Sequence, residues 1–93
     1  MKVYTIEKFS PLGDLLGRTY YRTQAEARRG LRLSLLIYKE ADRLEVVNLG
    51  RGYYYVWNPR TLRGWFLKLM ASEIPDNSSE ARFLSVKGEG EGA

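Results

Sequence analysis

The sequence predicts an α+β domain, in which a small antiparallel sheet of four to five strands carries two helices on one face. Alternating apolar and polar residues form several short segments, each bounded by Gly, Pro, Asn or Asp. Two longer segments place apolar residues at helical spacing. The chain has 93 residues, of which 44% are apolar and 28% charged, as expected for one modest globular domain. We expect this domain to span residues 1–87 and residues 88–93 to form a disordered acidic Gly/Glu tail.

The first expected unit is a hairpin. Residues 2–9 (KVYTIEKF) alternate, so that Val3 and Phe9 face one side of a strand and Tyr4 and Ile6 face the other. The proline and glycine in residues 11–14 are typical of a tight turn. Residues 15–21 then form the returning strand.

A helix is expected to follow from Gln24. Thr23 and Glu26 have the spacing of a capping box, in which both side chains accept hydrogen bonds from free backbone amides. Gly30 leaves two possibilities open: one helix through residue 39, or a short helix that ends at Gly30 before a strand over 31–38. We favour the long helix because it gathers bases into a ridge on one side, namely Arg28, Arg29, Arg32 and Lys39.

A second hairpin is expected over residues 44–49 and 53–57, joined by a Gly-Arg-Gly turn. Tyr53, Tyr55 and Trp57 alternate along its second strand and therefore share one face. Asn58 and Pro59 are favoured at a helix cap and at the first helical position. A second helix over 59–72 is expected, because the apolar residues fit the helical template in full: Leu62, Trp65, Phe66, Leu69 and Met70.

Residues 82–86 would add a short edge strand to this sheet, after the loop 76–80 (DNSSE). The expected order is therefore β-β-α-β-β-α, with an optional last strand.

The composition excludes most enzyme classes. The chain has no cysteine and no histidine, which removes the commonest nucleophile, general base and metal ligands. It also lacks a glycine-rich phosphate loop and a nucleophile elbow. We therefore expect a protein without catalysis, metal or cofactor. No apolar run approaches the length of a membrane span, so we expect no membrane partner and a cytoplasmic location.

The charges are unevenly distributed. Residues 18–68 hold eleven bases against four acids, a net charge of +7, whereas residues 69–93 have a net charge of −3. Arginine predominates among the bases, and its planar guanidinium suits phosphates and carboxylates. The sequence thus predicts a small nucleic-acid-binding protein in which arginines contact phosphates and aromatic residues stack. The candidate residues are Arg28, Arg29, Arg32, Arg51, Tyr53, Tyr55, Trp57, Arg60 and Arg63.

Residues 51–56 (RGYYYV) resemble the core of the RNP1 motif of the RNA-recognition-motif family. The resemblance implies that Tyr53 and Tyr55 stack on bases and that Tyr4 stands where the companion motif has its aromatic residue. The chain departs from the family pattern at Tyr54, at Asn58 and in having two strands before its first helix.

The alternative prediction is a compact protein-binding accessory or inhibitor, of the kind that viruses and mobile elements encode. Its aromatic and basic residues would then meet an acidic surface on a larger protein. A sheet covered on one face leaves its second face open, so a homodimer through that face is compatible with either prediction.

Overall fold

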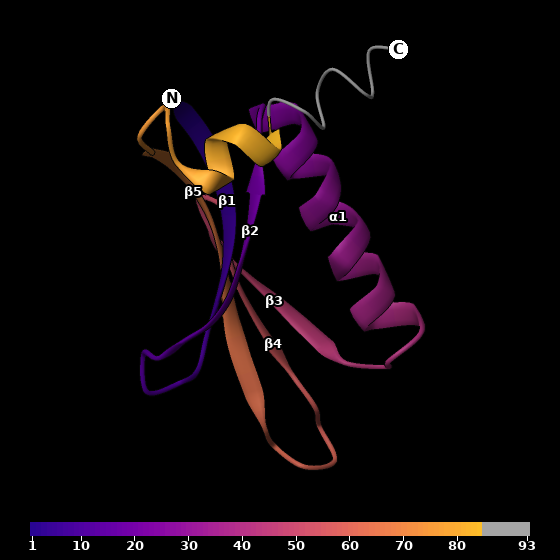
Figure 1. Cartoon of the computed structure of the whole chain (residues 1–93). Helices are drawn as coiled ribbons and strands as arrows, with labels where there is room; N and C mark the ends of the chain where they lie inside the picture. Colours follow the sequence, from indigo (N-terminus) through magenta and orange to yellow (C-terminus); the bar gives the residue numbers. More distant parts are fainter. Residues whose placement is uncertain (85–93) are drawn as a thin grey trace.

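The computed structural model describes residues 1–84 and contains one five-stranded antiparallel sheet, a long helix and a short helix (Figure 1). The strands stand side by side in the order β2-β1-β5-β4-β3. The α+β class is confirmed, but the chain order is β-β-α-β-β-β-α. The elements are β1 Lys2–Phe9, β2 Leu15–Tyr21, α1 Gln24–Glu40, β3 Glu45–Gly50, β4 Tyr53–Trp57, β5 Gly64–Glu73 and a short helix over 79–84.

The predicted hairpins and the long helix are confirmed. The Thr23 hydroxyl accepts a hydrogen bond from the Glu26 amide at 3.1 Å and caps α1. The helix runs without a break through Gly30, so residues 31–38 are helical and not a strand. Glycine fits here because Tyr21 of β2 packs against it: a methyl group at Gly30 would lie 2.8 Å from Tyr21 Cζ. Glycine in a helix interior costs about 1 kcal/mol relative to alanine, but here it leaves room for an aromatic ring.

The predicted helix over 59–72 is wrong, because residues 64–73 form β5 between β1 and β4. Trp65 and Phe66 therefore point to opposite faces of the sheet, although helical spacing put them on one side. Leu67, which lies outside the helical template, is almost completely buried, at 3% exposure. The strand wins because it pairs along both edges and places Leu67 in the core.

The signals for a helix start at Asn58 form a single turn instead. The Asn58 side-chain oxygen accepts hydrogen bonds from the amides of Arg60 at 2.8 Å and Thr61 at 3.4 Å. Leu62 then adopts a left-handed conformation with φ of 62°, which stops helical propagation. Asn58 thus caps the β4–β5 connection and not a helix.

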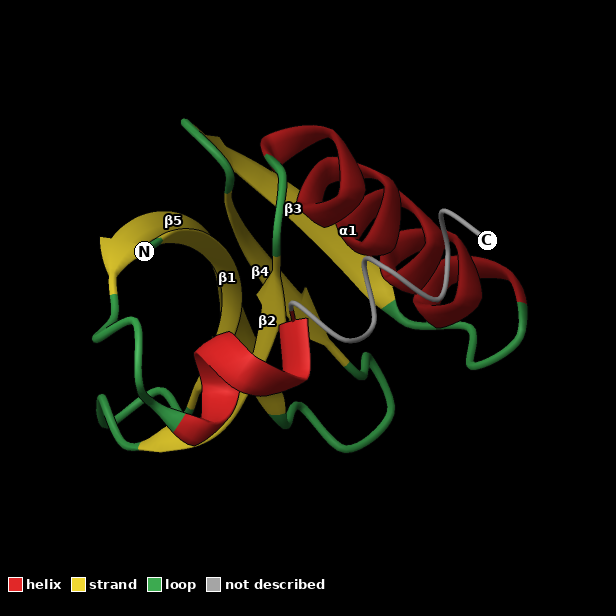
Figure 2. Cartoon of the chain, turned by 45° about the horizontal axis from the view of Figure 1, so that its top comes forward, coloured by secondary structure: helices red, strands yellow, loops and turns green. Residues whose placement is uncertain are grey.

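The core lies between α1 and one face of the sheet (Figure 2). Ile6 of β1, Val56 of β4 and Leu67 of β5 pack with Leu31 of α1. Each such side chain contributes about 1.5–3 kcal/mol when it is removed from water. Trp65 extends this layer. Its ring and that of Tyr38 form a T-shaped pair with centroids 5.4 Å apart, and the Lys8 amine lies 4.2 Å from the centroid of the Trp65 ring.

The short helix over 79–84 lies on the other side of β2 from α1 (Figure 2). Its residues Ala81 and Leu84 are buried, and it shares a hollow with Arg18 and Tyr20, which point away from α1. The prediction of two helices on one face is therefore wrong. The predicted strand over 82–86 is also wrong for residues 82–84, which are helical, and its last two residues and the predicted tail 88–93 lie outside the described residues.

Candidate binding face

A row of apolar side chains crosses the sheet on the face opposite α1. Strand pairing places one residue of each strand in register, in the order Leu15, Phe9, Phe66, Tyr55 and Val47. With neighbouring strands about 4.8 Å apart, the row spans about 19 Å. We call these five residues the aromatic strip.

The rings in and beside the strip pack against one another. Phe66 lies at the centre, 4.8 Å from the ring of Tyr55 and 5.4 Å from that of Tyr53, with which it is stacked. Such ring pairs add about 0.5–1.5 kcal/mol beyond the area they bury. The Tyr55 hydroxyl and the Trp57 side chain lie directly over Gly64, where a methyl group would lie only 2.8 Å from Trp57 Cβ. Gly64 therefore leaves the space that these two aromatic side chains occupy.

This surface is accessible at both ends and hollowed at its centre. Leu15 and Val47 are 46% and 44% exposed at the outer strands, whereas the three rings between them are half-buried. Beside the strip, the β1–β2 loop and the strands border an open hollow of about 510 Å³. Its lining residues are Glu7, Phe9, Ser10, Pro11, Gly13, Tyr53, Phe66, Lys68 and Met70. A hollow of this size accepts a large apolar side chain of a partner.

The charges beside the strip cancel. The next row on one side contains Arg18, Glu7, Lys68 and Tyr53, and the row on the other side contains Gly64, Trp57 and Glu45. Arg18 forms an ion pair with Glu7, whose side chain is buried. Tyr20 and Glu7 raise the pKa of the Arg18 guanidinium further above its ordinary value. The strip therefore has a polar rim without a net charge.

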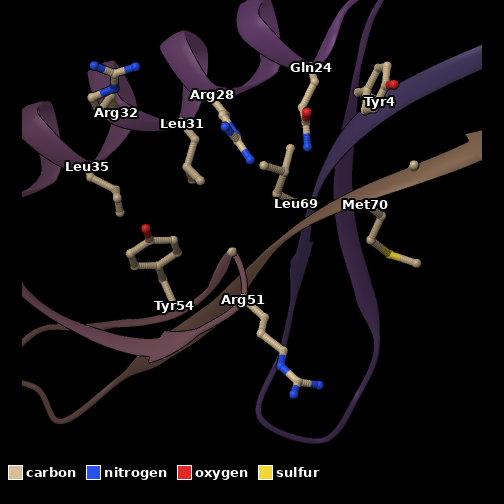
Figure 3. Close-up of a pocket in the computed structure, with 12 residues that line it drawn as sticks. Tyr4, Gln24, Arg28, Leu31, Arg32, Leu35, Arg51, Tyr54, Leu69 and Met70 are labelled. Atoms are coloured by element: carbon tan, nitrogen blue, oxygen red, sulfur yellow. The ribbon is translucent and has the colours of Figure 1, made fainter.

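Several predicted arginines lie on the opposite side of the sheet from the strip. Arg28 and Arg32 of α1, with Arg51 of the β3–β4 turn, line a groove between α1 and the sheet (Figure 3). Arg29 is exposed on α1, and Arg60 and Arg63 are exposed in the β4–β5 turn. The predicted site residues thus divide into an aromatic group of Tyr53, Tyr55 and Trp57 on one face and arginines elsewhere.

The resemblance to RNP1 is met in part. Tyr53 and Tyr55 share the sheet face away from the long helix, as the resemblance implies. Tyr4 lies on the other face, where it lines the groove beneath α1, so the expected companion position is wrong. Two strands precede α1 and three follow it, which is not the element order of that family.

Sequence reasoning missed five residues of this face: Phe9, Leu15, Val47, Phe66 and Lys68. The alternation of residues 2–9 places Phe9 on one face of a strand, but it does not indicate which residues of other strands lie beside Phe9 on that face. The predicted helix over 59–72 contains Phe66 and Lys68. A period-two reading of residues 65–70, in which Trp65, Leu67 and Leu69 alternate with Phe66, Lys68 and Met70, was the available signal.

Within residues 1–84, no group of three or more Asp, Glu, His or Cys residues could hold a metal ion. In the same part of the chain, no helix has the length and apolar character needed to cross a membrane. Burial raises the pKa of Tyr21 and, with a smaller effect of Asp42, that of Tyr38. Both tyrosines belong to the layer beneath α1 and not to the strip.

Comparisons with protein families, with curated proteins and with solved structures found no match for this chain.

Proposed function

We propose that this chain is a non-enzymatic protein-binding module that docks on another protein through the aromatic strip. One observation carries this proposal: five apolar side chains stand in register across all five strands, partly exposed and bordered by a rim without net charge. Apolar patches with polar rims are typical of protein interfaces. A partner with an apolar anchor would fill the hollow beside Phe9 and Phe66.

The arrangement favours a protein over a nucleic acid at this face. Nucleobases stacked on the strip would need nearby cations for their phosphates. Of the basic residues next to the strip, Lys68 is the one that lacks an ion pair within residues 1–84. Its amine lies 6.0 Å from the Tyr53 ring centroid. The second subunit of a homodimer would meet the same requirements as any other protein partner.

Nucleic-acid binding is the second candidate, and the basic side of α1 favours it. Arg28, Arg32 and Lys39 lie on one flank of this helix. Contacts of that flank with phosphates would weaken steeply with salt. Such a ligand would occupy the α1 side, with the strip left free.

The test places a photoreactive benzoylphenylalanine at Val47 in the strip, with Leu36 on the outer side of α1 as the matched control. Both positions are about half-exposed, at 44% and 55%. The purified variants are irradiated alone and in cell extract, and the adducts are identified by mass spectrometry. In parallel, labelled single-stranded and double-stranded oligonucleotides are titrated at low and near-physiological salt, with Arg28→Glu combined with Arg32→Glu.

We expect a discrete protein adduct, or a covalent dimer, from position 47 and none from position 36. The adduct should disappear when Phe66→Ser is added to the Val47 probe. Equal labelling from both positions would contradict the proposal. Salt-dependent oligonucleotide binding that is lost in the double arginine variant, without an adduct from position 47, would replace the proposal by the second candidate.

A further inference from the structure

We infer that the groove between α1 and the sheet is a binding site for a small organic anion with an apolar body, and that Arg28 holds its anionic group. The groove has a volume of about 570 Å³, within the range of about 300–1,000 Å³ that is usual for small-molecule sites. It lies on the opposite side of the sheet from the aromatic strip, so this inference does not depend on the proposed function.

The two walls of the groove come from different elements (Figure 3). The helix contributes Gln24, Arg28, Leu31, Arg32 and Leu35, which repeat at helical spacing along its inner flank. The sheet side contributes Tyr4, Arg51, Gly52, Tyr54, Leu69, Met70 and Ala71. Gly52 and Ala71 have little or no side chain, so this wall does not fill the space beneath the helix.

The charge of the groove calls for an anion. Its described lining contains arginines but no Asp or Glu. Arg28 makes no ion pair and no side-chain hydrogen bond with any residue of the described chain, and its guanidinium points into the groove beside Gln24 (Figure 3). Arg32 and Arg51 point away from the groove centre. A guanidinium that has no acidic partner binds a carboxylate or a phosphate through two parallel hydrogen bonds.

The other end of the groove is apolar. Leu31 and Leu35 lie there, and the hydroxyl of Tyr54 is directed toward Leu35, whereas Leu69 lies below Arg28 and Gln24 (Figure 3). No hydrogen bond joins this hydroxyl to another residue of the described chain. An aliphatic or aromatic body would rest on Leu31 and remove the partly exposed Leu35 and Leu69 from water, while the polar groups at the other end fix its direction. An anion without such a body would leave Leu35 and Leu69 partly exposed.

The experiment uses straight-chain carboxylates as probes. Butanoate, hexanoate and octanoate are titrated into the whole chain, and backbone amide resonances are followed by NMR. Inorganic phosphate tests the anionic group alone, and octylammonium tests the apolar body with the opposite charge. We expect octanoate to shift the resonances of groove residues and its affinity to exceed that of hexanoate by about fourfold per methylene, the factor that corresponds to about 0.8 kcal/mol.

Variants then locate the site. Arg28→Gln should weaken octanoate binding about tenfold or more, because it removes a charge-assisted pair of hydrogen bonds. Arg29→Gln is the matched control, since Arg29 is the next residue of the same helix but does not line the groove. Ala71→Trp fills the groove from an exposed position and should abolish binding while the protein keeps its thermal transition.

Three results would overturn the inference. The first is that octanoate shifts no groove resonances at millimolar concentration, or shifts those of the aromatic strip instead. The second is that phosphate or octylammonium binds as tightly as octanoate. The third is that Arg28→Gln and Arg29→Gln weaken binding equally, which would indicate a general attraction to a basic helix.

Discussion

Gly64→Ala distinguishes the strand β5 from the helix that the sequence predicts, because the two structures give opposite signs. In a helix interior, alanine is more stable than glycine by about 1 kcal/mol. In β5, a methyl group at this position would lie 2.6 Å from the Val56 carbonyl oxygen and 2.8 Å from Trp57 Cβ. Contacts this short require the paired strand or the aromatic side chains to move.

The size of the effect follows from two opposing contributions. Overpacking a well-filled site costs about 1–3 kcal/mol. Removing the backbone freedom of glycine from the unfolded chain returns about 0.4–1 kcal/mol. The Val56 oxygen belongs to the backbone of a central strand and cannot rotate away, so the cost should exceed the gain. We expect Gly64→Ala to lower the free energy of unfolding by about 1–2 kcal/mol.

Urea unfolding, followed by tryptophan fluorescence, measures this change, with Gly17→Ala as the control. Gly17 also lies in a strand, but a methyl group there has no neighbour within 4 Å. The control should therefore show only the backbone contribution and be stabilised by about 0.4–1 kcal/mol. A stabilised Gly64→Ala protein would refute both the strand and the close packing of Tyr55 and Trp57 over Gly64.

Two further predictions concern the layer beneath α1. Gly30→Ala should fail to stabilise the helix, because its methyl group meets Tyr21. When Tyr21→Leu removes the ring, the same substitution should stabilise the protein by about 1 kcal/mol. Thermal unfolding of the single and double variants measures both effects. Burial raises the pKa of Tyr21 and Tyr38 in the folded state, so the unfolded chain loses these protons first as the pH rises. The free energy of unfolding should therefore keep its full value below pH about 10 and fall above it. Tyr38→Phe should flatten this alkaline decline, and a decline of unchanged slope would contradict the burial of that hydroxyl.

The parts of the fold that the sequence predicts correctly depend on local signals that tertiary structure does not oppose. The N-terminal hairpin, the capped start of α1 and the second hairpin each combine a periodic segment with a turn or cap of matching type. Their predicted boundaries agree with the structure to within one or two residues. Gly30 leaves the length of α1 open because its partner, Tyr21, lies on the preceding strand and only the packed structure shows the contact.

Residues 59–72 show why the remaining strand was not predicted. The cap at Asn58 is real, but a cap closes one turn as readily as it starts a helix. Five apolar residues fit helical spacing, which requires the adjacent residues Trp65 and Phe66 both to be apolar. A strand that carries apolar residues on both faces also has adjacent apolar residues, so it produces the same pattern. The choice between the two is made by pairing with β1 and β4, which is not visible in the local sequence.

The candidate site was predicted only as a set of residue types. Alternation correctly placed Tyr53, Tyr55 and Trp57 on one face. Phe9 and Phe66 join them through pairings between segments that are far apart in the sequence. Register decides which residues become neighbours across a sheet, and one sequence contains little information on register between distant strands.

The position of the charges determines how the two surfaces relate to each other. Layers of secondary structure pack about 10 Å apart, and ionic screening acts over about 8 Å at physiological ionic strength. The exposed arginines of α1 therefore contribute little to the potential at the strip on the far side of the sheet. A strand that carried bases at alternate positions would have brought the net charge of residues 18–68 onto the aromatic face, but Tyr53–Trp57 contains none. An anion in the groove and a protein on the strip should therefore bind independently, so that Arg28→Gln impairs the first and Phe66→Ser the second.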